Sequence, residues 1–195
     1  ENIFETVDGM IDENITSSRW YRHPDLTNDF SYNEVPLIDG VIYDGYFQSE
    51  KYFKDVKIEN FFKFKKNLIS DVTKKYDINL DKTYTSLHCR FGGDRDNVET
   101  QHFHKNVSKD FYLKSLSLLP KSDIKFVVSD NISLSKEILD DKIDNVIYVE
   151  DSMENSFVLM SLCNYNIIGN STFSWWASYL NSNKNKIGRA HVWTP

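Results

Sequence analysis

The sequence predicts an α/β fold in which a parallel sheet carries helices on both faces. Two observations lead to this prediction. From residue 83 onward, short runs rich in β-branched and aromatic residues alternate with segments of helical periodicity, and polar side chains follow each strand-like run. Such alternation builds a parallel sheet, because each crossover helix returns the chain to the same end of the sheet. Right-handed crossovers then bring the carboxyl ends of all strands to one edge.

The residues ahead of this alternation are less regular. Residues 1–40 are polar and aromatic, and "RWYRHPDL" (19–26) is predicted to be irregular. The segment "GVIYDGYF" (40–47) is β-branched and aromatic and begins at a glycine, which favours a strand. In residues 58–76, apolar positions recur near helical spacing while lysines fill the other face, which indicates an amphipathic helix.

Four strand–helix pairs make up the alternating part. The expected strands are residues 83–90, 124–130, 145–151 and 165–170. The expected helices are residues 108–119, 133–141, 154–164 and 171–181. Ser108 is expected to cap the first of these helices and Ser133 to open the second, because serine favours helix starts.

Composition narrows the class of protein. The chain has 195 residues, of which 40% are hydrophobic and 27% charged, and this excludes disorder of the whole chain. The net charge is −6 and no basic stripe is present, so nucleic-acid binding is not expected. Cys89 and Cys163 lie in apolar surroundings without metal-type spacing, which favours two buried thiols in a reducing compartment. No signal peptide or transmembrane run is visible, so the expected location is the cytoplasm, with peripheral membrane association as an alternative.

The stretch "SLHCRFGGD" ends the first strand of the alternating part with a cation and a glycine-rich turn. The guanidinium fork of Arg90 suits two parallel hydrogen bonds to phosphate oxygens. Gly92 and Gly93 let backbone amides turn toward the same anion. Asp94 could hold the turn. His88 could donate to phosphate or orient the arginine, and the alternative is an ordinary buried histidine.

Polar side chains also follow the other three strands. They are Asp130 and Asn131, then Glu150 and Asp151, then Asn170, Ser171 and Thr172. Each of these residue types also caps helices and forms turns, so a purely structural role is the alternative at every position. Together they predict a ligand crevice at the carboxyl edge of the sheet. Asp130 and Asn131 suit hydrogen bonds to a base edge or a ribose, and Ser171 and Thr172 could hold phosphate at a helix N-terminus.

The sequence resembles the α-1,2-fucosyltransferase family, glycosyltransferase family 11. The matching stretches are "DGYFQSEKYF" (44–53), "SLHCRFGGD", "FVVSDN" (126–131) and "IIGNSTFSWWASYLN" (167–181). The last is the most specific, because Asn-Ser-Thr-Phe-Ser-Trp-Trp after an apolar strand is rarely met by chance. The family's Gly-rich "GGLGNQMFQ"-like start does not occur in this sequence, so the chain resembles the C-terminal two-thirds of such an enzyme.

The resemblance implies a GT-B-type glycosyltransferase whose Rossmann-like C-terminal lobe binds the donor and whose N-terminal lobe is incomplete here. Residues 1–57 are then expected to be a remnant of the N-terminal, acceptor-binding lobe and the interlobe connection. Residues 58–185 are expected to form the Rossmann-like nucleotide-sugar-binding domain. Residues 186–195 resemble translated adapter sequence and are interpreted as a non-native tail.

The activity that the resemblance implies is inverting, metal-independent transfer of L-fucose from GDP-fucose to the 2-hydroxyl of a galactoside in a glycan. No cofactor and no metal are expected; the partners are GDP-fucose and a glycan acceptor. The alternatives are another nucleotide-sugar donor or linkage, or a truncated remnant that only binds. Little or no turnover is expected from these 195 residues alone, because half of the interlobe crevice would be absent.

The family's phosphate motif, His-x-Arg-Arg-x-Asp, carries over to His88, Arg90 and Asp94 as catalytic residues. Phe91 stands where a second arginine is usual, and Gly93 is a one-residue insertion. Asp94 and Glu99 are alternative bases. The donor-binding residues implied are His88, Arg90, Gly92, Gly93, Asp130, Asn131, Asn170, Ser171, Thr172 and Phe173.

Overall fold

The structure is a computed structural model that describes six stretches of the chain: residues 3–5, 19–27, 32–91, 107–139, 142–183 and 186–188. The chain divides into two compact units. The larger comprises Glu1–Glu5 with Lys63–Arg189, and the smaller comprises Thr6–Phe62 with Ala190–Pro195.

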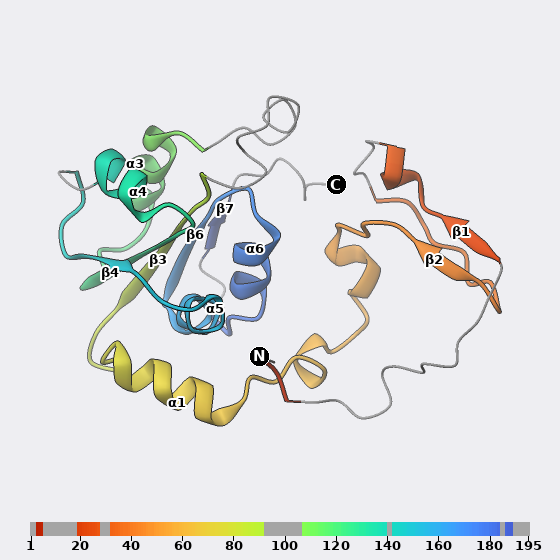
Figure 1. Cartoon of the computed structure of the whole chain (residues 1–195), viewed down its shortest axis with the longest axis horizontal. Coiled ribbons are helices and arrows are strands. Elements are labelled where there is room, and N and C mark those ends of the chain that lie inside the picture. Colours follow the sequence, from red (N-terminus) through yellow and green to blue (C-terminus); the bar gives the residue numbers. More distant parts are fainter. Residues whose placement is uncertain are drawn as a thin grey trace. The chain divides into compact units, whose positions relative to one another are not determined.

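The larger unit contains a five-stranded sheet in the order β5-β4-β3-β6-β7, and every neighbouring pair is parallel (Figure 1). Its strands are β3 (Tyr84–Cys89), β4 (Ile124–Ser129), β5 (Val146–Val149), β6 (Tyr165–Ile168) and β7 (Lys186–Gly188). The first four lie where the sequence predicts strands. β7, which the sequence analysis leaves out of the fold, pairs with β6 and forms one edge of the sheet.

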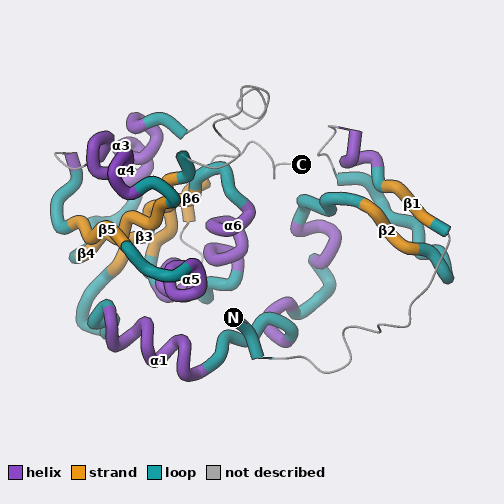
Figure 2. Tube along the Cα trace, in the orientation of Figure 1, coloured by secondary structure: helices purple, strands orange, loops and turns teal. Residues whose placement is uncertain are grey.

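In the described part of the chain, five α-helices cover the two faces of this sheet (Figure 2). They are α1 (Lys66–Lys75), α3 (Lys109–Leu118), α4 (Ile132–Leu139), α5 (Met153–Leu162) and α6 (Thr172–Tyr179). Adjacent residues of β4 point to opposite faces: Phe126 joins the buried cluster with Val72 of α1 and Val158 of α5, whereas Val127 joins the cluster with Leu139 of α4. The predicted fold class, a parallel sheet with helices on both faces, is confirmed.

α3 and α4 each begin where a side chain accepts a hydrogen bond from a backbone amide of the first helical turn. Ser108 caps α3 as predicted, because its hydroxyl accepts a hydrogen bond from the Phe111 amide. α4 begins one residue earlier than the predicted Ser133. The reason is Asn131, whose side-chain oxygen accepts from the Leu134 amide at 3.0 Å and thereby takes the capping role.

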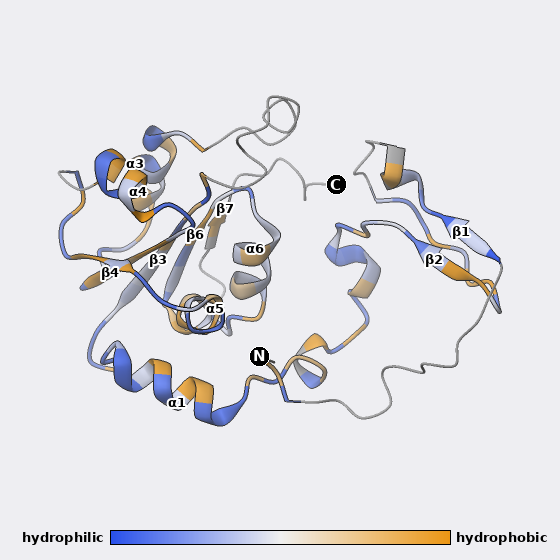
Figure 3. Ribbon diagram, viewed as in Figure 1, coloured by the Kyte–Doolittle hydropathy of each residue, from blue (hydrophilic) through white to orange (hydrophobic). Residues whose placement is uncertain are grey.

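The amphipathic helix ahead of the sheet also differs from the prediction. A short 3-10 helix, Ile58–Asn60, precedes an extended stretch, and only then does α1 begin. In that stretch Phe64 forms an antiparallel bridge with Phe4, and both rings pack against Phe157 of α5. Burial of these aromatic rings opposes continuation of the helix through Phe64. Figure 3 shows α1 itself alternating between hydrophobic and hydrophilic ribbon, as an amphipathic helix should.

The smaller unit contains a two-stranded parallel sheet made of β1 (Trp20–Arg22) and β2 (Ile42–Asp44). β2 lies inside the predicted strand. The prediction of an irregular segment at β1 is wrong, because this segment pairs with β2, and the rings of Tyr21 and Tyr43 meet across the pair at 5.6 Å. Pairing with a strand some twenty residues away is a long-range contact that local composition does not reveal.

Two of the described 3-10 helices of the smaller unit, Pro24–Thr27 and Glu50–Phe53, flank a buried histidine, His23. The Nε2 atom of His23 lies 3.0 Å from the Tyr52 hydroxyl. Its ring also contacts that of Phe47, with centroids 4.9 Å apart. These contacts give His23 a role in the packing of this unit.

Candidate functional site

The strand order places a topological switch point between β3 and β6. From β3 the chain moves outward through β4 and β5, and it then returns to the other side of β3 to form β6 and β7. α3, the first described helix after β3, packs with one buried cluster, and α6, which follows β6, packs with the other, so the two helices lie on opposite faces of the sheet. Open α/β sheets bind ligands at such a point, outside the carboxyl ends of the strands. Arg90, directly after β3, and Asn170, shortly after β6, therefore follow neighbouring strands on this edge.

Arg90 follows β3 directly and is tied to the end of β4. Its Nε atom lies 3.2 Å from one carboxylate oxygen of Asp130, and the other oxygen accepts from the Phe91 amide at 2.8 Å. The Arg90 side chain is 36% exposed, so a ligand at the edge can reach it. The Asp130 carboxylate thus holds both the Arg90 side chain and the next backbone amide, and it links two residues that the sequence predicts for the site.

His88 lies beneath this edge and not on its surface. It is buried, its carbonyl accepts from the Tyr112 hydroxyl at 3.0 Å, and its ring faces that of Phe173 with centroids 5.7 Å apart. Phe173 in turn packs edge-on against Phe157 of the core. Both predicted site residues therefore support the edge from within.

Gly169, at the end of β6, is a further residue of this region that sequence reasoning missed. A Cβ atom placed on it would lie 2.9 Å from the carbonyl oxygen of His88, closer than such atoms approach in proteins. A side chain here would force the end of β6 away from the end of β3. The signal in the sequence was a glycine at the end of an apolar strand, which marks close approach of another backbone. Tyr112, buried on α3, carried no such signal.

The remaining described candidates lie at the starts of α4 and α6. Asn131 caps α4, as noted above, so part of its side chain is engaged. Asn170 and Ser171 are half-buried and Thr172 is exposed. Within the described chain, the Ser171 side chain makes no capping hydrogen bond to α6. The amides of that first turn are therefore not satisfied by this hydroxyl, which is the arrangement an anion at a helix N-terminus requires.

Other predicted residues lie outside the described residues. They are Gly92, Gly93, Asp94 and Glu99. Their assignment as turn, phosphate-binding and base residues stays a prediction.

Asp151, at the end of β5, has a structural environment. Its carboxylate is 7% exposed and lies 2.9 Å from the Lys75 ammonium, and it also accepts hydrogen bonds from the Tyr76 hydroxyl and the Asn155 amide. Burial alone would raise the pKa of Asp151, but these hydrogen bonds outweigh it and lower the pKa to about 2. The residue anchors the end of α1 to the start of α5.

The thiols are unsuited to chemistry. Cys89 and Cys163 are both free and buried, as predicted. Burial raises the pKa of the Cys89 thiol to about 12, and it raises that of Cys163 as well, so both stay protonated.

In the stretches that the structure describes, no three His, Cys, Asp or Glu side chains are grouped so that they could hold a metal ion. The same stretches contain no helix with the length and apolarity needed to cross a membrane.

The glycosyl transferase family 11 model matches residues 14–187, a span that includes every candidate residue above. The chain belongs to this family. The resemblance seen in the sequence is thereby confirmed.

Two relatives of this family 11 protein come from Escherichia coli. An alpha-1,2-colitosyltransferase is 32% identical over 146 residues, which are 70% of this chain and 50% of the relative. The O-antigen biosynthesis glycosyltransferase WbnK is 31% identical over 109 residues, 53% of this chain and 36% of the relative. The chain spans half, or less, of the length of these relatives.

A solved structure shares the fold of this family 11 protein. The crystal structure of POFUT1 in complex with GDP-fucose superposes with a TM-score of 0.53 at 16% identity, covering 77% of this chain and 55% of the other. At this identity the likeness concerns the fold alone. It agrees with the GT-B-type α/β fold that the sequence predicts.

Proposed function

We propose that this chain is the donor-binding part of an inverting fucosyltransferase that moves L-fucose from GDP-fucose to the 2-hydroxyl of a galactoside in a glycan. Membership of glycosyl transferase family 11 supports glycosyl transfer. An α-1,2 linkage in the name of one relative and GDP-fucose in a structural neighbour support the linkage and the donor. The observation that carries the proposal is Arg90, held by Asp130 at the switch point of the sheet.

The chemistry explains why a cation is needed there. When the bond between the fucose anomeric carbon and the β-phosphate oxygen breaks, negative charge grows on GDP and the sugar gains oxocarbenium character. A guanidinium aimed at the diphosphate stabilises charge that is larger in the transition state than in the ground state, which is how binding accelerates a reaction. The acceptor hydroxyl attacks the opposite face of the sugar and loses its proton to a base, for which Asp94 and Glu99 stay candidates. The proposed reaction requires no cofactor and no metal.

The proposed contacts with the donor come from residues at the carboxyl ends of the strands. Arg90 contacts the diphosphate together with the turn at Gly92 and Gly93, and the first turn of α6 contributes from the other side of the switch point. His88 acts from below by holding the end of β3. The full set proposed to bind the donor is His88, Arg90, Gly92, Gly93, Asp130, Asn131, Asn170, Ser171, Thr172 and Phe173.

A second candidate is transfer of colitose from its nucleotide-activated form. The relative named alpha-1,2-colitosyltransferase covers 70% of this chain, which favours this alternative over other donors. Colitose is L-fucose without its 3-hydroxyl, so the two donors place the same demands on the phosphate-binding residues. A chain that binds nucleotide without turnover is the third alternative.

A nucleotide panel tests the proposal. The melting temperature of the chain is measured with GDP, UDP and ADP, for the wild type, for Arg90→Ala and for the matched control Arg22→Ala in the smaller unit. A ligand that binds the folded state raises the melting temperature. We expect a shift with GDP alone, lost in Arg90→Ala and kept in Arg22→Ala. A response to UDP or ADP instead would contradict the guanosine donor, and silence from a folded protein would contradict nucleotide binding.

Donor choice is tested separately with a polypeptide that extends over the full length of its relatives. Transfer to a galactoside is compared with GDP-fucose and with GDP-colitose as donors. The proposal predicts at least about tenfold higher kcat/KM for GDP-fucose, because a site built to bond a hydroxyl discriminates against its absence. The reverse preference would establish the colitose alternative.

A further inference from the structure

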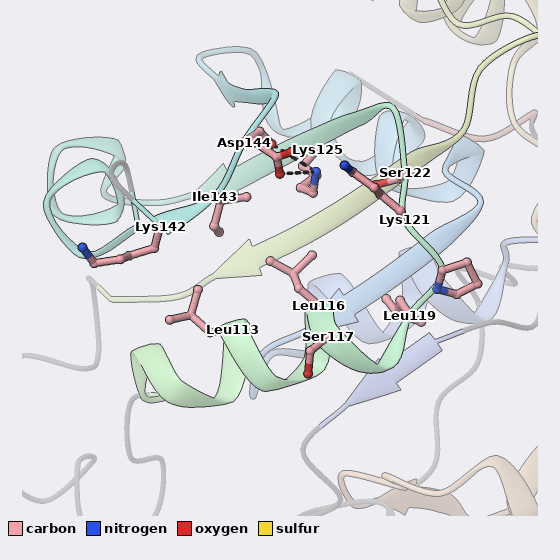
Figure 4. A pocket seen from close by; sticks show the side chains of 11 residues that line it. Leu113, Leu116, Ser117, Leu119, Lys121, Ser122, Lys125, Lys142, Ile143 and Asp144 are labelled. Carbon is pink, nitrogen blue, oxygen red and sulfur yellow. Dashed lines mark hydrogen bonds and ion pairs between the residues drawn. The ribbon is translucent and has the colours of Figure 1, made fainter.

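A cavity lies at the amino edge of the sheet, away from the strand ends that carry the candidate donor site. It has a volume of about 310 Å³ and is lined by α3, by the connection from α3 to β4 and by residues that precede β5 (Figure 4). Lys125, the second residue of β4, lies in its wall. Nucleotides in open α/β sheets bind at the opposite, carboxyl edge. A volume at the lower end of the range for ligand pockets, roughly 300–1,000 Å³, suits a molecule smaller than a nucleotide sugar.

The cavity contains a buried cation. The side chain of Lys125 is 8% exposed, and its ammonium donates to the carbonyl oxygen of Asp144 at 3.0 Å and to its carboxylate at 3.1 Å. An ammonium has three N–H donors. Among the described residues, these two bonds are the ones that Lys125 makes with its side chain. An acceptor that enters the cavity can take the third donor.

Two neighbours extend this polar end. Ser122 is buried, and its hydroxyl accepts from Thr85 at 2.9 Å, so its own hydrogen can be donated to a ligand. The hydrogen bond with Lys125 lowers the pKa of Asp144, and the charge of Lys121 lowers it further; both lysines line the cavity. Of the described residues that line the cavity, three are lysines and one is an aspartate, so its field favours an anion.

The rest of the wall is apolar. Leu113 and Leu116 project from α3 toward the strands, and Ile143, which is buried, lies near them in the same view (Figure 4). A free inorganic anion would leave these side chains without a partner. A ligand with a charged head and a short hydrocarbon body would contact both the lysine end and the leucine wall.

We propose that this cavity binds a small carboxylate that carries a short aliphatic chain, with the carboxylate at Lys125, Ser122 and Lys121 and the chain against Leu113 and Leu116. The site differs from the donor site in location and in ligand. It does not depend on the function proposed above.

The test is an NMR titration of the ¹⁵N-labelled protein with three probes: hexanoate, hexylammonium and inorganic phosphate. Hexanoate should shift the amides of Leu113–Lys125 and of the residues ahead of β5 in a saturable manner. Hexylammonium has the same body with the opposite charge, and phosphate has a charge without the body. Both should bind at least about tenfold more weakly than hexanoate.

Substitutions of single lysines test whether the Lys125 ammonium binds hexanoate. Lys125→Met keeps an unbranched side chain but removes the ammonium, and it should weaken hexanoate binding at least about tenfold. Lys114→Met, on α3 but outside the cavity, should bind as the wild type does, and GDP binding should be the same in all three proteins. If Lys125→Met does not fold, the exposed Lys121→Met decides in its place, with an expected loss of about threefold. Unchanged hexanoate binding in the deciding variant, equal binding of hexylammonium, or saturable shifts elsewhere would overturn the proposal.

Discussion

Asp130 and Asp151 follow neighbouring strands at one edge of the sheet, yet their surroundings differ. The carboxylate of Asp151 is 7% exposed and satisfied by Lys75, Tyr76 and other donors of adjoining helices. The carboxylate of Asp130 is 27% exposed and pairs with Arg90, the candidate phosphate ligand. One aspartate anchors helices to the sheet, and the other positions a cation at the site.

The comparison shows that residue type at a strand end does not decide its role. Both aspartates suit nucleotide contacts when they are considered as sequence alone, and both suit turns. Burial and partners separate them: a carboxylate saturated with hydrogen bonds has little capacity left for a ligand, whereas one beside a partly exposed arginine controls the arginine. The two aspartates should therefore respond differently to substitution: Asp151 in stability and Asp130 in ligand affinity.

The largest effect on stability is expected from Asp151→Asn. This change removes the charge that bonds Lys75 and Tyr76, and hydrogen bonds to a charged group contribute about 1.5–3 kcal/mol each, so we expect a loss of about 2 kcal/mol in the free energy of unfolding. Urea denaturation measures it. GDP affinity should not change by more than about twofold. A large loss of GDP affinity in a folded variant would mean that Asp151 belongs to the site.

The same carboxylate predicts a pH dependence. Its pKa in the folded state is about 2, below the ordinary value of 3.8, so it contributes stability above about pH 4 that is lost as the pH falls toward 2. The difference corresponds to about 2 kcal/mol. Urea midpoints measured from about pH 5 to about pH 2 should show the gap between wild type and Asp151→Asn closing on acidification. A gap that stays constant would contradict the role given to the charge.

Asp130→Asn should affect binding more than stability. The pair with Arg90 is partly exposed, so the free energy of unfolding should fall by less than about 1 kcal/mol. With the arginine no longer held, we expect GDP affinity to fall about tenfold, equivalent to about 1.4 kcal/mol. Isothermal titration calorimetry measures it. Rescue of affinity by Asp130→Glu, which restores the charge, would distinguish positioning of Arg90 from a general loss of structure. Wild-type affinity in Asp130→Asn would contradict the positioning role.

The smallest effect on stability is expected at an exposed ion pair with a similar N···O distance. Lys82 lies 2.8 Å from Asp77, close to the 2.9 Å between Lys75 and Asp151, but it lies in an exposed turn. Solvent screens such a pair, so Asp77→Asn should leave the urea midpoint almost unchanged in the same assay. A loss as large as that of Asp151→Asn would mean that burial is not what distinguishes the two carboxylates.

The sequence predicted those parts of the fold that local signals encode. β3 and the Ser108 cap of α3 were predicted because an apolar run and a hydroxyl at a helix start are local features. The late start of α1 could not be predicted, because it depends on Phe4 meeting Phe64, sixty residues along the chain. β1 could not be predicted for the same reason, because it forms by pairing with β2.

The same limit applies to the site. Arg90 and its strand end were predicted from the pattern of an apolar run followed by Arg and glycines. The ion pair between Arg90 and Asp130 could not be predicted, and neither could the close approach of Gly169 to His88. Both contacts depend on which strands are neighbours in the sheet. The parallel order of β4, β3 and β6 supplies that information.

Arg90 is proposed to bind the diphosphate of the donor. Calorimetric titration with GDP and with guanosine tests this proposal most directly. The difference between the two affinities isolates the diphosphate contribution. In the wild type we expect GDP to bind at least about a hundredfold more tightly than guanosine, since charge-assisted bonds to phosphate are among the strongest available. In Arg90→Ala that ratio should fall below about ten while guanosine affinity stays unchanged. An unchanged ratio in Arg90→Ala would contradict the claim.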